Sequence, residues 1–122
     1  MTHRRNERVG EEIRAVLAEA VREIRDPRVG FVTLTGVVLS PDLKQAKVYV
    51  SRLGSASERD DAVDALNEAV AFLRRAVSTR AKLRHTPLLR FFSDATLERG
   101  SRVEAILQEL HADDPEDEPD SR

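Results

Sequence analysis

The sequence contains no cysteine, only three histidines and few aromatic residues. Without cysteine the chain cannot form disulfides, thiolate nucleophiles or cysteine-based zinc sites. The histidines, His3, His85 and His111, are too far apart for a metal-ligand spacing, so we expect no metal and no other cofactor. Aromatic residues make up 4 % of the chain, so base stacking alone is not expected to carry recognition of a nucleic acid.

Long apolar runs are also lacking, and no stretch of the sequence is predicted to span a bilayer. Residues 2–6 (Thr-His-Arg-Arg-Asn) lead straight into a charged helical pattern, so no cleavable signal is expected. A chain of 122 residues is long enough for one hydrophobic core and too short for two. We therefore expect a single-domain, cytoplasmic protein that is a monomer.

The charge is unevenly distributed along the chain. Residues 113–122 hold six of the 22 acids and one of the 20 bases, which leaves 16 acids and 19 bases in residues 1–112. No acid occurs between Ala69 and Ser93. The bases in that segment are Arg74, Arg75, Arg80, Lys82, Arg84 and Arg90. A mildly basic domain with a concentrated basic surface indicates a polyanionic partner.

The first half of the chain predicts a helix followed by a β-hairpin. Apolar residues recur with helical spacing over residues 6–25, and Asp26-Pro27 ends that pattern. Residues 31–40 and 44–53 are rich in strand-forming residues, and the segment between them, Ser-Pro-Asp-Leu at 40–43, is typical of a turn. Gly36 within the first strand predicts a bulge or a close backbone approach.

The second half predicts two helical segments, a third strand and a last helix. Ser57 and Asp60 form a plausible capping box for a helix whose pattern continues toward Leu83. That helix is too long to pack straight across a small sheet, so we expect a kink or break within it. Residues 88–93 form the third strand. The last helix has an apolar stripe at Val103, Ile106, Leu107 and Leu110.

The element order is therefore α-β-β-α-α-β-α, which fits an α+β domain with helices packed on one face of a three-stranded sheet. We assign this domain to residues 1–112. Residues 113–122 are acidic, contain two prolines and lack apolar residues, so we expect a disordered tail.

The aromatic residues are predicted to pack rather than to bind. Tyr49 lies on the polar face of the second strand, where it could stack on a base, although packing on the sheet surface is favoured. Phe31, Phe72, Phe91 and Phe92 are interpreted as core residues, with Phe91 and Phe92 on opposite sides of their strand. His85 is interpreted as a helix C-terminal residue that interacts with the helix dipole.

Three segments together resemble ribosome-binding factor A in order and spacing, and the resemblance covers about residues 4–111. They are 26–30 (Asp-Pro-Arg-Val-Gly); 40–43 with 46–51 (Ser-Pro-Asp-Leu and Ala-Lys-Val-Tyr-Val-Ser); and 83–87 (Leu-Arg-His-Thr-Pro) through Phe91-Phe92 to Asp94. The resemblance implies a type II KH fold and binding to the immature small ribosomal subunit near its neck. It also implies help in maturing the 5′ end of the small-subunit ribosomal RNA, support of growth in the cold, and release linked to a ribosome-associated GTPase.

One motif departs from the family. Instead of the Gly-x-x-Gly loop of KH domains, the family has an Ala-x-Gly helix kink, and the matching residues here are Ala69, Val70 and Ala71. Alanine favours helix and disfavours positive φ. The kink is therefore either shallower in this chain or held by tertiary contacts alone.

The acid-free segment supplies the main candidate RNA-binding residues. These are Arg74, Arg75, Arg80, Lys82 and Arg84. Arg75 and Lys82 are seven residues apart, so they would share one side of a helix. Arg80 and Arg84 are four apart, with no acid in reach along the helix to neutralise them. The alternative is an ordinary solvated helix face, and Arg84 could instead pair with Asp94.

A second basic group precedes and begins the first helix. Arg4, Arg5 and Arg8 could form an arm that contacts a nucleic-acid backbone, or a flexible arm without consequence. The sequence has no catalytic triad, phosphate-binding glycine loop or paired carboxylates at a mechanistic spacing, so an enzyme is not expected. The alternative to RNA binding is a protein-interaction adaptor whose basic face meets an acidic protein.

Overall fold

The computed structural model describes residues 2–94, with side chains from residue 5 onward. The elements are α1 (Thr2–Ala20), the 3-10 helix η1 (Val21–Glu23), β1 (Val32–Leu39), β2 (Gln45–Arg52), α2 (Ala56–Glu68), α3 (Val70–Arg80) and β3 (Leu88–Ser93). The order of the first six predicted helices and strands is confirmed. The last predicted helix and the acidic tail, residues 113–122, lie outside the described residues.

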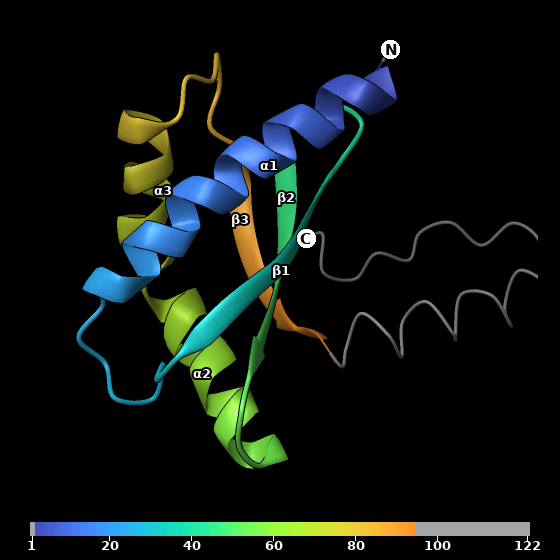
Figure 1. Ribbon diagram of the computed structural model, residues 1–122. Coiled ribbons are helices and arrows are strands. Elements are labelled where there is room, and N and C mark those ends of the chain that lie inside the picture. Colours follow the sequence, from blue (N-terminus) through green and yellow to red (C-terminus); the bar gives the residue numbers. More distant parts are fainter. Residues whose placement is uncertain (1, 95–122) are drawn as a thin grey trace, which may run out of the picture.

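The three strands form one sheet with the order β1-β2-β3 (Figure 1). β1 and β2 are antiparallel neighbours, as the hairpin pattern predicted, and β3 pairs with β2 in parallel. The register between β1 and β2 shifts between Leu34 and Gly36, which confirms a bulge beside the glycine.

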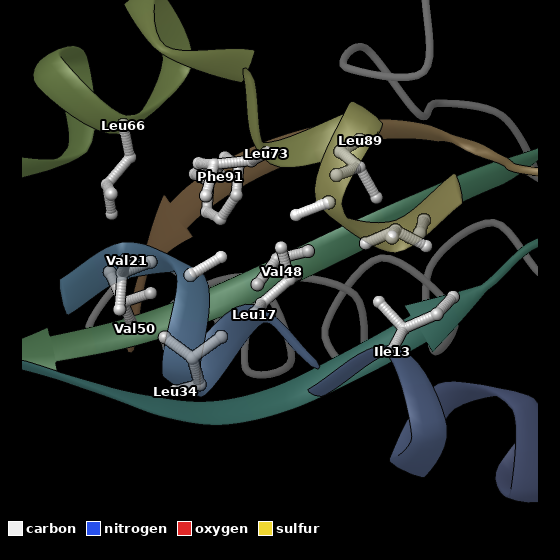
Figure 2. Close-up of a cluster of buried hydrophobic side chains, with 14 of the residues drawn as sticks. Ile13, Leu17, Val21, Leu34, Val48, Val50, Leu66, Leu73, Leu89 and Phe91 are labelled. Atoms are coloured by element: carbon white, nitrogen blue, oxygen red, sulfur yellow. The ribbon is translucent and has the colours of Figure 1, made fainter. Parts of the chain in front are cut away.

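The three helices pack against a single face of this sheet. Ala46, Val48 and Val50 alternate along β2 and are all buried in the core. Figure 2 shows Val48 and Val50 facing side chains of the helix layer, among which Leu17 of α1 and Leu73 of α3 are fully buried. The structure is therefore a two-layer α+β domain of the expected class.

The connection from α1 to β1 is built by the segment 26–30. The predicted helix to residue 25 ends early, because Ile24 already has an extended backbone with ψ 126°. The Asp26 carboxylate accepts a hydrogen bond from the Arg28 amide at 3.0 Å, which is turn chemistry. Gly30 has a φ of +57°, and an added Cβ would lie 2.6 Å from the Arg52 guanidinium. Only glycine fits there without strain.

Helix α2 starts earlier than predicted, with a different capping box. The Ser55 hydroxyl accepts a hydrogen bond from the Glu58 amide, and the Glu58 carboxylate accepts one from the Ser55 amide. The prediction of Ser57 and Asp60 was therefore wrong by two residues. Gly54, with a φ of +133°, turns the chain immediately after β2, so Ser55 is the first residue able to cap.

The predicted break in the long helical segment is confirmed and falls at Ala69. This residue has φ −96° and ψ 15° and separates α2 from α3. The predicted continuation toward Leu83 is wrong, because α3 ends at Arg80 and Ala81 is extended. His85 therefore lies in the loop 81–87, not at a helix end, and its predicted interaction with the helix dipole is also wrong.

The aromatic residues behave differently from one another. Phe91 is buried in the core and Phe72 packs against it, as predicted. Phe31 is 96 % exposed, so its assignment to the core was wrong. β1 starts only at Val32, which takes the core-facing position beside the turn. Phe92 is half-buried and its ring lies 5.6 Å from that of Tyr49, so packing of Tyr49 on the sheet surface is confirmed.

Candidate nucleic-acid interface

Two of the five predicted cations in the acid-free segment bond within the domain. The Arg74 guanidinium donates hydrogen bonds to the carbonyl oxygens of Thr86 and Pro87 at 2.8 and 3.0 Å. Arg80 forms an ion pair with Glu23 at 3.1 Å, and the hydrogen bonds from that pair raise the pKa of Arg80. As predicted, Arg80 has no acidic neighbour along its own helix. In the folded domain, however, an acid from another segment lies beside it. The neutralising acid lies 57 residues earlier in the sequence.

Three cations of the segment remain exposed and make no ion pair or side-chain hydrogen bond within residues 2–94. They are Arg75, Lys82 and Arg84. Arg75 lies on α3, whereas the other two lie in the loop 81–87. The predicted sharing of one helix side by Arg75 and Lys82 is therefore wrong, because the helix ends between them. Because the helix ends before Arg84, the prediction that Arg80 and Arg84 are neighbours on one helix is wrong too.

The suggested pairing of Arg84 with Asp94 is not found in the described part of the chain. The Asp94 carboxylate instead accepts a hydrogen bond from the Thr35 hydroxyl at 3.0 Å. That hydroxyl also donates to the carbonyl oxygen of Tyr49 at 3.1 Å, so Asp94 bonds to the bulge of β1 rather than to Arg84. Arg84 remains a candidate for external contact.

The N-terminal basic group is helical in this structure. α1 begins at Thr2, so Arg4, Arg5 and Arg8 lie on its first two turns and do not form an extended arm. Arg5 and Arg8 are exposed, and neither makes an ion pair among the described residues. A helix presents their side chains at fixed intervals, which a flexible arm would not do.

Two side chains at the end of α2 hold the helix break and were not identified from the sequence. The Asn67 amide accepts a hydrogen bond from the Phe91 backbone N–H at 2.9 Å and donates one to its carbonyl oxygen at 3.1 Å. Glu68 and Asp26 both form ion pairs with Arg28 at 2.7 Å, and these contacts lower the pKa of both carboxyl groups. Contacts with distant segments therefore stabilise the break at Ala69. The motif at this break has Ala71 where the family has glycine.

The charges divide the helix layer into two regions. The exposed face of α2 carries acids, among them Asp60, Asp61 and Asp64, whereas α3 and the loop that follows it carry only bases. In Figure 1 these two helices follow each other, and the loop 81–87 leads away from α2. The exposed cations Arg75, Lys82 and Arg84 therefore lie on α3 and the loop that follows it, where they favour an anionic partner.

Residues 2–94 contain no group of three or more histidine, aspartate or glutamate side chains that could hold a metal ion. Within the same range, no helix is long and apolar enough to cross a membrane. The exposed arginine and lysine side chains of α3 and the loop 81–87 can hold phosphates.

Comparison with known proteins gives consistent matches. A family model described as ribosome-binding factor A matches residues 5–107. The ribosome-binding factor A of Thioalkalivibrio sulfidiphilus is 45 % identical over 117 residues, which cover 95 % of this chain and 91 % of the relative. The crystal structure of ribosome-binding factor A from Thermus thermophilus is 28 % identical, with a TM-score of 0.65, covering 72 % of this chain and 94 % of that one.

A further similar structure is a homology model of the Thermus thermophilus factor, fitted into the cryo-EM map of a complex of 30S with ribosome-binding factor A. It is 30 % identical, covers 68 % of this chain and 88 % of that chain, and has a TM-score of 0.59. These similarities extend over the helices and the sheet described above. They confirm the KH-like α+β fold that the resemblance implied.

Proposed function

The chain belongs to the ribosome-binding factor A family, and we propose that it binds the immature small ribosomal subunit through ribosomal RNA. This proposal rests on a set of exposed cations whose side chains make no ion pair or hydrogen bond within the described part of the domain. The side chains of Arg75, Lys82 and Arg84 have no acidic partner in the described part of the chain, although those of Arg74 and Arg80 beside them do have internal partners. Phosphates of RNA are the partners that such cations fit.

The role of the cations in this proposal is to position the domain on RNA. Contacts from arginine and lysine to phosphates fix orientation and carry no sequence information. Tyr49 is buried against Phe92 and so does not present a ring for base stacking. Specificity for the subunit then comes from the shape of folded RNA rather than from its base sequence.

Family membership also supports a more detailed proposal. We propose that the protein acts late in small-subunit maturation, including maturation of the 5′ end of the ribosomal RNA, and leaves once the subunit is mature. A ribosome-associated GTPase assists that release, and the protein supports growth in the cold. It acts as a cytoplasmic monomer and catalyses no reaction itself.

Sedimentation of a cell extract through a sucrose gradient tests the proposal. The protein should travel with free small subunits and be absent from mature ribosomes. Limited ribonuclease treatment before sedimentation should release it, because the contacts are with RNA phosphates. Sedimentation at the top of the gradient in both samples, or retention on an acidic protein after ribonuclease treatment, would contradict RNA-based binding and support the adaptor.

A further inference from the structure

Glu12 of α1 makes a hydrogen bond to the loop that follows α3. Its carboxylate accepts a hydrogen bond from the backbone N–H of Lys82 at 2.8 Å, which joins two residues 70 positions apart. Lys82 is the second residue after the end of α3, so this bond holds the start of the loop 81–87 against α1. Glu12 therefore places an acid beside a loop that carries bases and no acid of its own.

The other end of the same loop is also held. Arg74 bonds to the carbonyl oxygens of Thr86 and Pro87, and the Leu88 N–H donates to the Lys44 carbonyl oxygen at 2.9 Å. Lys82 and Arg84 are exposed between these two anchored ends. A loop that is ordered before binding loses less conformational entropy when its cations meet a ligand.

Helical spacing brings the N-terminal cations toward this loop. Arg8 and Arg5 precede Glu12 by four and seven residues, so all three lie on nearly the same side of α1. The rise of an α-helix puts Arg8 about 6 Å and Arg5 about 10 Å from Glu12 along the axis. Glu12 therefore marks the point where the cations of α1 and those of the loop meet.

We propose that Glu12 is a positioning residue that joins Arg5 and Arg8 with Lys82 and Arg84 into one continuous strip for the phosphates of a single RNA strand. This inference rests on the proposed function. Glu12 touches no phosphate in this arrangement. Its carboxylate fixes the loop, and that contact outweighs the repulsion between its own charge and the RNA.

Three substitutions separate positioning by Glu12 from the effect of its charge. Glu12→Gln keeps an oxygen that can accept the Lys82 N–H, whereas Glu12→Ala removes the acceptor. Glu19→Ala is the matched control, because Glu19 is an exposed acid on the same side of α1 and, among the described residues, makes no hydrogen bond or ion pair with the loop 81–87. Binding to a single-stranded RNA oligonucleotide is measured by fluorescence anisotropy, and exchange of the Lys82 amide by NMR.

Glu12→Ala should bind the oligonucleotide about threefold to tenfold more weakly than the parent, because the loop side chains must then be ordered on binding. The Lys82 amide should exchange faster in this variant. Glu12→Gln and Glu19→Ala should bind at least as tightly as the parent, since each removes a negative charge. If Glu12→Ala instead binds as tightly as Glu19→Ala, Glu12 acts only through its charge and the inference is wrong.

Paired substitutions test whether the strip is continuous. Glutamine at Arg5 and Arg8 should lower the salt slope of binding by about 1.4, and glutamine at Lys82 and Arg84 by the same amount. All four together should lower it by about 2.8 on the same oligonucleotide. An unchanged slope for either pair would overturn the single strip. Failure of the parent to bind either RNA or small subunits would overturn the proposed function instead.

Discussion

Ala71 occupies the position where the family has a glycine, yet the backbone there makes no demand for one. It is the second residue of α3 and its side chain is exposed. Among the described residues other than glycine, only Leu43 has a positive φ. The break itself falls at Ala69, whose φ of −96° any residue can adopt. The kink in this chain therefore does not depend on backbone freedom at position 71.

Replacement of Ala71 with glycine should lower the free energy of unfolding by about 0.5–1 kcal/mol, because glycine loses more backbone entropy in a helix. Ala15→Gly, at an exposed position inside α1, is the matched control and should have a similar cost. Urea denaturation of both variants checks this. A neutral or stabilising effect at position 71, alongside the normal cost at position 15, would mean that the site is strained.

The ion pairs of Arg28 make the stability of the domain depend on pH. Its hydrogen bonds lower the pKa of Asp26 and of Glu68, so both carboxylates stabilise the folded state above their ordinary pKa values. That contribution is lost as pH falls through the lowered values, below about pH 4. Arg28→Gln should therefore melt at a lower temperature than the parent at pH 7, and the difference should shrink toward pH 2. Arg75→Gln, which breaks no ion pair among the described residues, should show no such pH-dependent difference.

The junction between α2 and α3 is attached to the sheet by Asn67. Its side-chain amide pairs with both backbone groups of Phe91 on the edge of β3 that β2 does not occupy. The contact replaces the hydrogen bonds that a neighbouring strand would make, and it fixes where α2 ends. The orientation of α3, and with it the position of Arg75, depends on this attachment.

Asn67→Ala should destabilise the domain by about 1–3 kcal/mol, because it leaves a partly buried N–H and a carbonyl without partners. Asn67→Asp keeps an acceptor for the Phe91 N–H and loses only the donor, so its cost should be smaller at a pH where both variants are folded. Chemical denaturation ranks the three proteins. Equal stability of Asn67→Ala and the parent would show that water satisfies the edge of β3.

Patterns within single segments predicted the elements well. Runs of strand-forming residues identified β1 and β2, and the length of the helical pattern predicted the break that occurs at Ala69. The ends of elements were harder to predict, because they depend on contacts made by other segments. Gly54 moves the capping box to Ser55, and the early end of α3 is stabilised by Glu12 and Arg74 through the loop 81–87.

The candidate site was also hard to predict from local patterns, because its side chains contact distant segments. The sequence predicted which segment is basic, and the structure divides its cations into internal and free ones. Arg74 and Arg80 bond to groups 12 and 57 residues away, and no local spacing reveals such partners. The meeting of α1 with the loop 81–87 is likewise a contact between distant segments, and no local pattern in the sequence reveals it.

This division of the cations gives a direct prediction for RNA binding. Replacing Arg75, Lys82 and Arg84 with glutamine should flatten the dependence of log affinity on log salt concentration by about two units, since each lost phosphate contact removes roughly 0.7–0.9. Binding should weaken about equally for unrelated RNA sequences, because phosphates carry no sequence information. The melting temperature should change little, since these side chains bond to nothing within residues 2–94.

Replacement of Arg74 and Arg80 with glutamine is the control for that prediction. Both side chains hold internal partners, so the double variant should lower the melting temperature and leave the salt slope close to that of the parent. Affinity measured between 50 and about 200 mM salt on one RNA separates the two effects. If the control flattened the slope as much as the triple variant does, Arg74 and Arg80 would exchange their internal partners for phosphates on binding. The free cations would then not define the interface, and the loop 81–87 would have to rearrange when RNA binds.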